Sequence, residues 1–257
     1  WRVLMIADNP GKLIESNLVL CLNEPSKIAD ASWIKPGKAA WDWWSGRLVE
    51  GKRGKPEQGD FSNDTYKKYV DFAADSKFEY FLVDAGWYGA DRDTLVDITI
   101  TGVPGVDIPE LVKYAAAKNV KIMLWLNWEA VKKQMDKAFP LYESWGVAGV
   151  KIDYMDRDDA EMVKFYHDVV ALAAQHKLLV DFHGAYKPDG MRRTWPNLIT
   201  REGVLGLEYV KWSEMTTPEH DVTIPYTRML VGPMDFTPGA FNNATQKGFK
   251  PVDVNPM

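Results

Sequence analysis

The feature that most constrains this chain is the run from 146 to 156 (GVAGVKIDYMD), where small and apolar residues end in the carboxylates Asp153 and Asp156. A buried parallel strand reads as continuous apolar sequence, so Asp153 is expected where such a strand leaves the core. In a (β/α)8 barrel the carboxyl ends of the strands form the active-site face. Asp153 is therefore the first candidate for chemistry.

Helix capping is the alternative for these carboxylates. Asp153, or Asp156 together with Asp158 and Asp159, could cap the helix that follows, because Asp is favoured at N-caps and in first turns. Capping suits Asp158 and Asp159 better than Asp153, which stands one residue inside the strand end.

The same strand pattern recurs along the chain. We expect seven strands, over 38–44, 80–87, 121–128, 146–156, 178–184, 197–203 and 228–236, and four intervening helices over 64–76, 107–118, 130–146 and 159–176. Alternating strands and helices imply parallel pairing through right-handed crossovers. Polar groups at every strand exit favour a barrel over an open sheet. The predicted fold class is α/β, a (β/α)8 TIM barrel that is incomplete in this chain, with about seven βα units visible.

Both ends of the chain differ from this pattern. Residues 1–24 hold two short apolar runs, 1–7 and 17–22, which predict two strands around a turn at Asn9 and a connection from an earlier domain. The tail from 241 to 257 is rich in Asn, Pro, Lys and Gly, and no eighth βα unit is visible. An open barrel would leave strand edges unpaired. We therefore expect the C-terminal part of the barrel to be missing from this chain.

Composition excludes several classes. A chain of 257 residues, 46% of them hydrophobic, can bury the core of one barrel-sized domain. A net charge of −5 without a long basic run argues against nucleic-acid binding. No apolar run reaches the roughly 18 residues of a membrane helix, so we expect no membrane insertion. The lone Cys21 is expected to be a buried, inert thiol.

Polar side chains at the predicted strand exits form the candidate site. They are Asp42, Asp84, Asn127, Asp153, Asp181 or His183, Glu202 and Asp235, and Glu208 follows six residues after Glu202. With 11 Trp and 11 Tyr in the chain, carboxylates in an aromatic pocket suit glycoside hydrolysis, which needs one carboxyl to protonate the leaving oxygen and another to attack or stabilise the anomeric carbon. Neighbouring like charges would raise the pKa of one carboxyl, as a general acid requires. Such a pocket also suits Ca²⁺.

Four ordered motifs resemble glycoside hydrolase family 97. They are 149–159 (GVKIDYMDRDD), 181–190 (DFHGAYKPDG), 201–209 (REGVLGLEY) and 232–239 (GPMDFTPG), and the resemblance covers about residues 1 to 240. It implies a calcium-containing α-glycosidase in which a β-sandwich domain precedes the catalytic (β/α)8 barrel and a small β domain follows it. Residues 1–24 would then connect from the absent β-sandwich, and 25–257 would be the catalytic domain. The resemblance also implies an oligosaccharide or glycoside substrate, flanking domains on the same polypeptide, and a periplasmic or secreted location.

The resemblance distinguishes two mechanisms. Inverting α-glucosidase members carry a base Glu after the fifth strand and lack the Asp after the fourth, whereas retaining α-galactosidase-like members have that Asp and no such Glu. Here the fourth strand ends in Asp153, and the fifth is followed by His183, Gly184 and Ala185. The chain thus resembles the retaining branch. By resemblance Asp153 is the nucleophile and Glu208 the general acid/base, and Glu202 and Glu208 are calcium ligands.

The remaining site residues are expected to contact substrate. Lys151 shares a strand face with Asp153 by alternation and could be a hydroxyl or charge partner, or an ordinary barrel-interior lysine. Asp42, Asp84, Asn127 and His183 would contact sugar hydroxyls, with Trp87 or Trp128 as stacking faces, although each could simply brace its neighbours. His167 and His176 are expected on the solvent side of their helix, and His220 in a loop.

The leading hypothesis is a retaining, exo-acting α-galactosidase that uses calcium. The alternatives are an α-glucosidase of the same family and a non-catalytic carbohydrate-binding barrel. The joint presence of Asp153 and Glu208 speaks against the non-catalytic alternative. A serine triad is not expected, because no Ser lies in a Gly-x-Ser-x-Gly turn.

Overall fold

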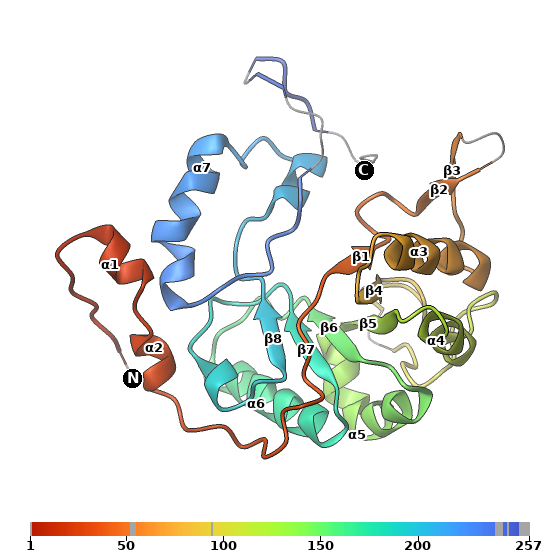
Figure 1. Cartoon of the computed structure of the whole chain (residues 1–257), viewed down its shortest axis with the longest axis horizontal. Helices are drawn as coiled ribbons and strands as arrows, with labels where there is room; N and C mark the ends of the chain where they lie inside the picture. Colours follow the sequence, from red (N-terminus) through yellow and green to blue (C-terminus); the bar gives the residue numbers. More distant parts are fainter. Residues whose placement is uncertain (1, 52–54, 94, 240–243, 246, 252–257) are drawn as a thin grey trace.

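The protein is built around a curled, parallel six-stranded sheet with the order β1-β4-β5-β6-β7-β8. The computed structural model describes residues 2–51, 55–93, 95–239, 244–245 and 247–251. The strands are β1 (Ala39–Trp41), β4 (Tyr80–Val83), β5 (Lys121–Asn127), β6 (Gly149–Asp153), β7 (Leu179–Phe182) and β8 (Leu198–Arg201). Figure 1 shows them fanned in an arc. Six of the seven predicted strands and their parallel pairing are confirmed, and they form half of a barrel wall within the described residues.

Four helices cover the outer side of the arc, as predicted (Figure 1). They are α3 (Asn63–Asp75), α4 (Ile108–Ala116), α5 (Trp128–Trp145) and α6 (Ala160–Gln175). Each begins where a polar side chain accepts a hydrogen bond from a backbone N–H of the first turn, and these caps are Ser62, Asp107, Asn127 and Asp159. The capping interpretation of Asp159 is thus confirmed.

Strand register brings chemistry-bearing side chains onto the inner face. Lys151 on β6 lies opposite Trp125 on β5 and Asp181 on β7. Register neighbours in a parallel sheet point to the same face, so these three side chains form one layer. Asn127 and Asp153, also register neighbours, form the next layer toward the carboxyl edge. The polar groups therefore concentrate at one end of the half barrel.

The predicted N-terminal strands are wrong. The segment instead forms two short helices, α1 (Pro10–Ile14) and α2 (Leu18–Cys21). Asn9 accepts a hydrogen bond from the backbone of Lys12, and Pro10 at the first helical position has the φ that a helix needs. Cys21 is exposed rather than buried. The apolar runs are too short for their pattern to separate helix from strand.

The predicted seventh strand is also wrong. After α7 (Pro218–Thr223), the chain forms 3-10 helices η4 (Ile224–Tyr226) and η5 (Arg228–Val231) and then continues without regular structure. Gly232 has a φ of 135°, and Pro233 has no N–H for a strand ladder. The prediction that His220 lies in a loop is wrong as well, because His220 lies on α7.

Shorter elements complete the fold. Strands β2 (Leu48–Glu50) and β3 (Pro56–Gln58) pair as an antiparallel hairpin between β1 and α3. Two more 3-10 helices are η2 (Met191–Arg193) and η3 (Leu207–Lys211). Among the described residues, no helix combines the length and apolarity needed to cross a membrane.

Candidate active site

The carboxyl edge of the sheet gathers the predicted polar groups. Asp42, Asp84, His183 and Glu202 directly follow β1, β4, β7 and β8, while Asn127 and Asp153 are the last residues of β5 and β6. All six strands are parallel, so these residues emerge at the same end of the half barrel. The prediction of polar strand exits is confirmed for these six strands.

A buried ion pair lies inside this edge. Lys151 Nζ is 3.0 Å from Asp84 Oδ2, with the two side chains only 4% and 5% exposed. The indole Nε1 of Trp41 donates to the same oxygen at 2.6 Å. Burial opposes the charge on Lys151, but the carboxylates of Asp84 and Asp153 outweigh it and raise the pKa of the lysine above its usual range. The site therefore holds a fixed positive charge.

Asp42 is buried beside this ion pair. Its Oδ1 accepts the backbone N–H of Asp84 at 3.0 Å, and within the described residues its Oδ2 has no hydrogen-bond partner. Burial, and then the charge of Asp84, raise the pKa of Asp42 to about 7. Asp42 can thus be a proton donor to a polar ligand near neutral pH.

Asp153 is fixed by two donors at the end of β6. Trp125 Nε1 donates to Oδ2 at 3.0 Å, and the backbone N–H of Tyr154 donates to Oδ1 at 2.7 Å. Tyr154 and Asp156 follow in the left-handed region, with φ values of 71° and 45°. Such backbone is uncommon for non-glycine residues and clusters at functional sites. These two hydrogen bonds hold the half-buried carboxylate in one orientation.

Two glutamates approach this carboxylate from the β8 side. Glu202 Oε2 accepts the N–H of Gly184 at 2.8 Å, and the N–H of Glu208, on η3, donates to Thr237 Oγ1 at 3.0 Å. Burial and then the charge of Glu202 raise the pKa of Glu208 to about 7, and Asp153 adds to the increase. The three carboxylates therefore share one electrostatic environment, in which Glu208 keeps its proton near neutrality.

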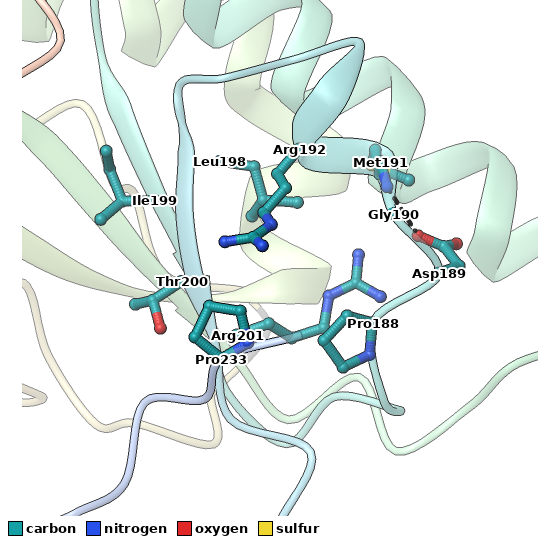
Figure 2. Close-up of a pocket in the computed structure, with 10 residues that line it drawn as sticks. All are labelled: Pro188, Asp189, Gly190, Met191, Arg192, Leu198, Ile199, Thr200, Arg201 and Pro233. Carbon is teal, nitrogen blue, oxygen red and sulfur yellow. Dashed lines mark hydrogen bonds between the residues drawn. The ribbon is translucent and has the colours of Figure 1, made fainter. Parts of the chain in front are cut away.

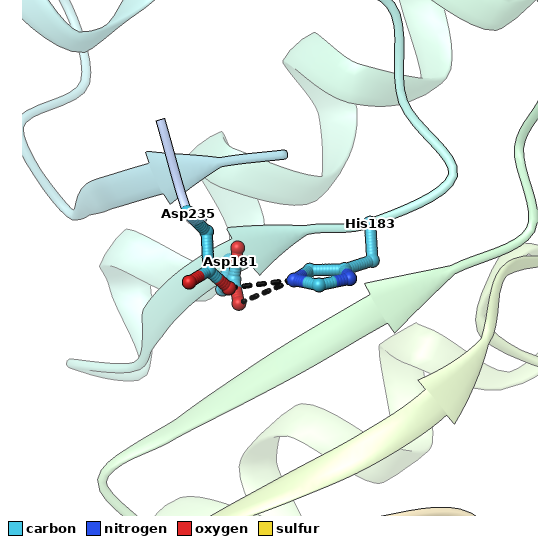
Figure 3. A group of neighbouring side chains, drawn as sticks. All are labelled: Asp181, His183 and Asp235. Atoms are coloured by element: carbon cyan, nitrogen blue, oxygen red, sulfur yellow. Dashed lines mark hydrogen bonds and ion pairs between the residues drawn. The ribbon is translucent and has the colours of Figure 1, made fainter. Parts of the chain in front are cut away.

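His183 links two further carboxylates, as Figure 3 shows. Its Nε2 lies 2.6 Å from Asp235 Oδ2 and 3.6 Å from Asp181 Oδ2. Burial and Lys151 oppose a positive imidazole, but Asp181, Asp235 and Glu202 outweigh them and raise the pKa of His183 to about 10. Burial also opposes charge on Asp235, yet the hydrogen bond with His183 lowers the pKa of that carboxyl.

These three side chains could in principle hold a metal ion. One ligand atom from each of Asp181, His183 and Asp235 lies within 4.8 Å of the others. A histidine that binds a metal must be neutral, whereas the raised pKa of His183 keeps its imidazole protonated. The short contact between His183 and Asp235 is therefore a hydrogen bond between charged groups. We interpret the cluster as a structural and hydroxyl-binding group.

A cavity of about 240 Å³ runs along the inner face of the sheet. Trp41, Lys151, Asp181, His183 and Asp235 all line it. A second hollow, beside β8, has a volume of only about 20 Å³, room for roughly one water molecule (Figure 2). Convergent polar groups on an otherwise apolar lining are typical of ligand sites, so the part of this cavity near Trp41, Lys151 and His183 is the candidate binding site. Asp153 and Glu208 are not among the residues that line the cavity.

The expectation for Trp87 is wrong. The ring of Trp87 is fully buried and its Nε1 donates to the carbonyl of Trp125 at 2.9 Å, so it presents no stacking face. Trp128 begins α5 and packs edge-on against Phe165. Trp87 therefore belongs to the core, and Trp128 to the packing of α5 against α6.

Asn127 has a local role that competes with substrate contact. Its Oδ1 accepts the N–H of Glu129 at 2.8 Å and its Nδ2 donates to the carbonyl of Asp91 at 3.1 Å. The side chain therefore caps α5 and braces the loop after β4. His167 is exposed on α6, as predicted.

Sequence reasoning missed Trp41, Gly184 and Arg228. Trp41 had a usable signal, because it immediately precedes Asp42 at a strand exit. Gly184 holds φ 52°, and a Cβ there would lie 3.1 Å from Asp153 Oδ1 and 2.8 Å from the nitrogen of Tyr154. Arg228 donates to the carbonyls of Arg201 and Glu202 and to three more nearby carbonyls. No pattern in the sequence predicts the contacts of Gly184 or of Arg228.

Comparison with known proteins gives consistent matches. The model of the family Glycoside hydrolase 97 matches residues 43–204. The curated "Retaining alpha-galactosidase" of Bacteroides thetaiotaomicron is 41% identical over 263 residues, which cover 100% of this chain and 38% of that protein. A "Probable retaining alpha-galactosidase" of Streptomyces bingchenggensis is 39% identical over 244 residues, 94% of this chain and 36% of that protein. The chain thus spans well under half the length of these curated relatives.

Solved structures also match. A glycoside hydrolase family 97 enzyme from Pseudoalteromonas sp. strain K8, in complex with acarbose, superposes with a TM-score of 0.81 at 34% identity. The match covers 97% of this chain and 42% of that chain.

Proposed function

This chain belongs to glycoside hydrolase family 97, and we propose that it is the catalytic part of a retaining, exo-acting α-galactosidase. The observation that carries the proposal is the environment of Asp153, a half-buried carboxylate fixed by Trp125 and Tyr154 within the electrostatic reach of Glu208. Two curated relatives named as retaining α-galactosidases support the choice of sugar and stereochemistry. The remaining strands of a (β/α)8 barrel would close the half barrel.

The proposed reaction has two displacements. In the first, a carboxylate oxygen of Asp153 attacks the anomeric carbon while the bond to the leaving oxygen breaks and Glu208 transfers its proton to that oxygen. In the second, Glu208 takes a proton from water, the water oxygen attacks the anomeric carbon, and the ester bond to Asp153 breaks. Two inversions retain the configuration, and this route requires carboxyl groups roughly 5–5.5 Å apart.

The electrostatics suit these roles. Burial and Glu202 raise the pKa of Glu208 to about 7, which lets it hold a proton to donate at neutral pH. Asp153 is oriented by the Trp125 indole and the Tyr154 N–H, so its attacking geometry is set before substrate arrives. The two carboxyl groups thus have different environments, as a nucleophile and an acid require.

Four polar groups, of which Lys151 and His183 line the cavity and Asp84 and Asp42 lie at the same edge of the sheet, would hold the galactose ring. Lys151 and His183 are buried cations that can donate to hydroxyl groups, while Asp84 and Asp42 can accept from them or, for Asp42, donate. Trp41 lines the same cavity and offers an aromatic face to ring C–H groups. We include these four polar residues in the proposed sugar site.

Calcium remains part of the proposal. Glu202 and Glu208 are the residues that would hold it, because two neighbouring carboxylates offer the oxygen ligands that Ca²⁺ prefers. Ca²⁺ takes 6–8 oxygen ligands, so other groups must complete its coordination. When bound, the ion would supply positive charge next to these two carboxylates. A periplasmic or secreted location, implied by the resemblance, belongs to the same proposal.

The test uses the full-length enzyme with p-nitrophenyl α-galactoside and α-glucoside, with and without chelator. We expect faster cleavage of the galactoside, loss of activity with chelator, and α-galactose as the first-formed sugar in proton NMR spectra. A first-formed β-anomer would remove Asp153 from the nucleophile role. Preferred cleavage of the glucoside would favour the α-glucosidase alternative.

Azide distinguishes the two carboxylates. With Asp153→Gly, azide should replace the nucleophile and give β-galactosyl azide, whereas with Glu208→Ala it should attack the glycosyl-enzyme and give α-galactosyl azide. Full activity in both variants would show that other residues carry out the reaction, and a wild-type enzyme without glycosidase activity would instead favour a non-catalytic carbohydrate-binding barrel.

A further inference from the structure

An aromatic row leads from the candidate sugar site toward solvent. The rings of Trp41 and Trp43 stack with centroids 5.2 Å apart, and the edge of Trp43 meets Trp212 at 6.2 Å. Tyr209 also packs against Trp212, with ring centroids 5.1 Å apart. Trp41 lines the cavity, whereas Trp212 is 51% exposed. The row therefore connects the cavity to the surface.

Lys211 fixes the outer part of this aromatic row. Lys211 is buried, donates to the carbonyl of Trp44 at 3.0 Å, and places its Nζ 4.4 Å from the ring centroid of Trp43. A buried cation under an aromatic face adds attraction and restricts the ring. Trp212 follows Lys211 directly, so its backbone is anchored although its ring is exposed.

The position of Glu208 indicates which part of the substrate would contact the aromatic row. Glu208 and Tyr209 lie on η3, and Trp212 caps the end of that short helix. In the proposed reaction Glu208 protonates the oxygen that joins the two halves of the substrate. The leaving group must therefore lie on the η3 side of the galactose site.

From this geometry we infer that Trp43, Tyr209 and Trp212 form a subsite for the leaving group, and that this group is a sugar ring. We call these three residues the aromatic platform. Sugar rings carry apolar C–H faces that pack on aromatic rings, and their hydroxyl edges stay solvated at an exposed site. The inference rests on the proposed function and adds that the substrate is an α-galactosyl oligosaccharide.

The experiment compares two donors in the full-length enzyme. α-Galactosyl fluoride releases fluoride and has no leaving sugar, whereas an α-galactosyl disaccharide has one. We expect Trp212→Ala to lower kcat/KM for the disaccharide about tenfold, mainly through KM, because ring stacking contributes to binding on that scale. Its kcat/KM for the fluoride should stay within about twofold of wild type, and Trp212→Phe should recover most of the loss.

Tyr226→Ala is the matched control, since Tyr226 is another exposed aromatic residue, on η4, with 52% exposure. It should leave both donors unaffected. An equal decrease on both donors, or an unchanged disaccharide reaction in Trp212→Ala, would overturn the platform while leaving the proposed function standing. A wild-type enzyme that cleaves neither donor would overturn the proposed function and this inference with it.

Discussion

Gly184 lies between Glu202 and Asp153: its N–H donates to Glu202 Oε2 at 2.8 Å, and its Cα faces Asp153. Its carbonyl also accepts the N–H of Asp156 at 2.7 Å. A side chain at Gly184 would approach the Tyr154 nitrogen to 2.8 Å and Asp153 Oδ1 to 3.1 Å. The glycine therefore lets the β6 and β7 exits meet.

Gly184→Ala should lower kcat for p-nitrophenyl α-galactoside about tenfold or more, because displacement of a reacting group by a fraction of an ångström is costly. Gly146→Ala is the control, since Gly146 also has positive φ, at 85°, but its new Cβ would meet only the side chain of Val112, at 3.3 Å. Both variants should lose stability, and only Gly184→Ala should lose kcat. Equal kcat values in the two variants would contradict the role of Gly184.

Lys151→Met should destabilise the protein by roughly 3–5 kcal/mol, because it leaves the buried Asp84 carboxylate without its cation. Lys151→Met combined with Asp84→Asn should recover part of that loss, since the second change removes the uncompensated charge. Urea unfolding of the full-length protein measures both. A double variant less stable than the sum of the two single changes would contradict a paired interaction.

The stability of the protein should depend on the ionisation of Asp42. Its pKa is raised from 3.8 to about 7 by burial, so between about pH 4 and 7 the folded state holds a proton that the unfolded state releases. The free energy of unfolding therefore falls as pH rises through this window, by on the order of 4 kcal/mol at most.

Asp42→Asn should flatten that dependence, with the urea midpoints at pH 4.5 and 7.5 closer together than in wild type. Asp64→Asn, at an exposed position on α3, is the control and should keep the wild-type dependence. If Asp42→Asn retained the full pH dependence, the Asp42 carboxyl would not be its source.

Arg228→Lys should lower both stability and activity although it preserves the charge. Arg228 Nη2 donates to the carbonyl of Arg201 at 2.9 Å, Nε to those of Glu202 and Gly203 at 3.0 Å, and Nη1 to that of Gly232 at 3.0 Å. A lysine ammonium cannot reach this set, so we expect a loss of about 1–3 kcal/mol.

Because the residues held by Arg228 include Glu202, kcat in Arg228→Lys should fall more than substrate affinity. Arg193→Lys is the control, since Arg193 contacts the carbonyl of Leu20, at 3.4 Å, on the N-terminal segment. If Arg228 had a purely structural role, Arg228→Lys would lower the unfolding midpoint, as Arg193→Lys would, and kcat would not fall more in Arg228→Lys than in Arg193→Lys.

Much of the fold and of the site could be predicted from local patterns. Continuous apolar runs ending in polar groups predicted the six strands, and the segments between them were predicted as four helices. Once strands and helices alternate, parallel pairing follows, and with it the meeting of Asp153, Asp84 and Asp42 at one edge. These inferences depend only on neighbours in the chain.

Other features depend on which distant segments pack together. The 228–235 run reads as a strand, yet Arg228 is buried among carbonyls of the 201–203 loop and the run curls instead. Trp87 follows a strand exit like its neighbours, but the tertiary structure turns its ring into the core.

The sequence by itself determined six of the strands, their parallel pairing and the set of carboxylates at the strand exits, because secondary structure and strand exits follow from local periodicity. Only the tertiary structure decided that His183 pairs with Asp235 across 52 positions, that burial raises the pKa of Glu208 and Asp42 to about 7, and that Trp212 stays exposed beside η3. The physical reason is that burial, pKa and contact between side chains are set by all the atoms that surround a group, and most of those atoms belong to residues far away in sequence.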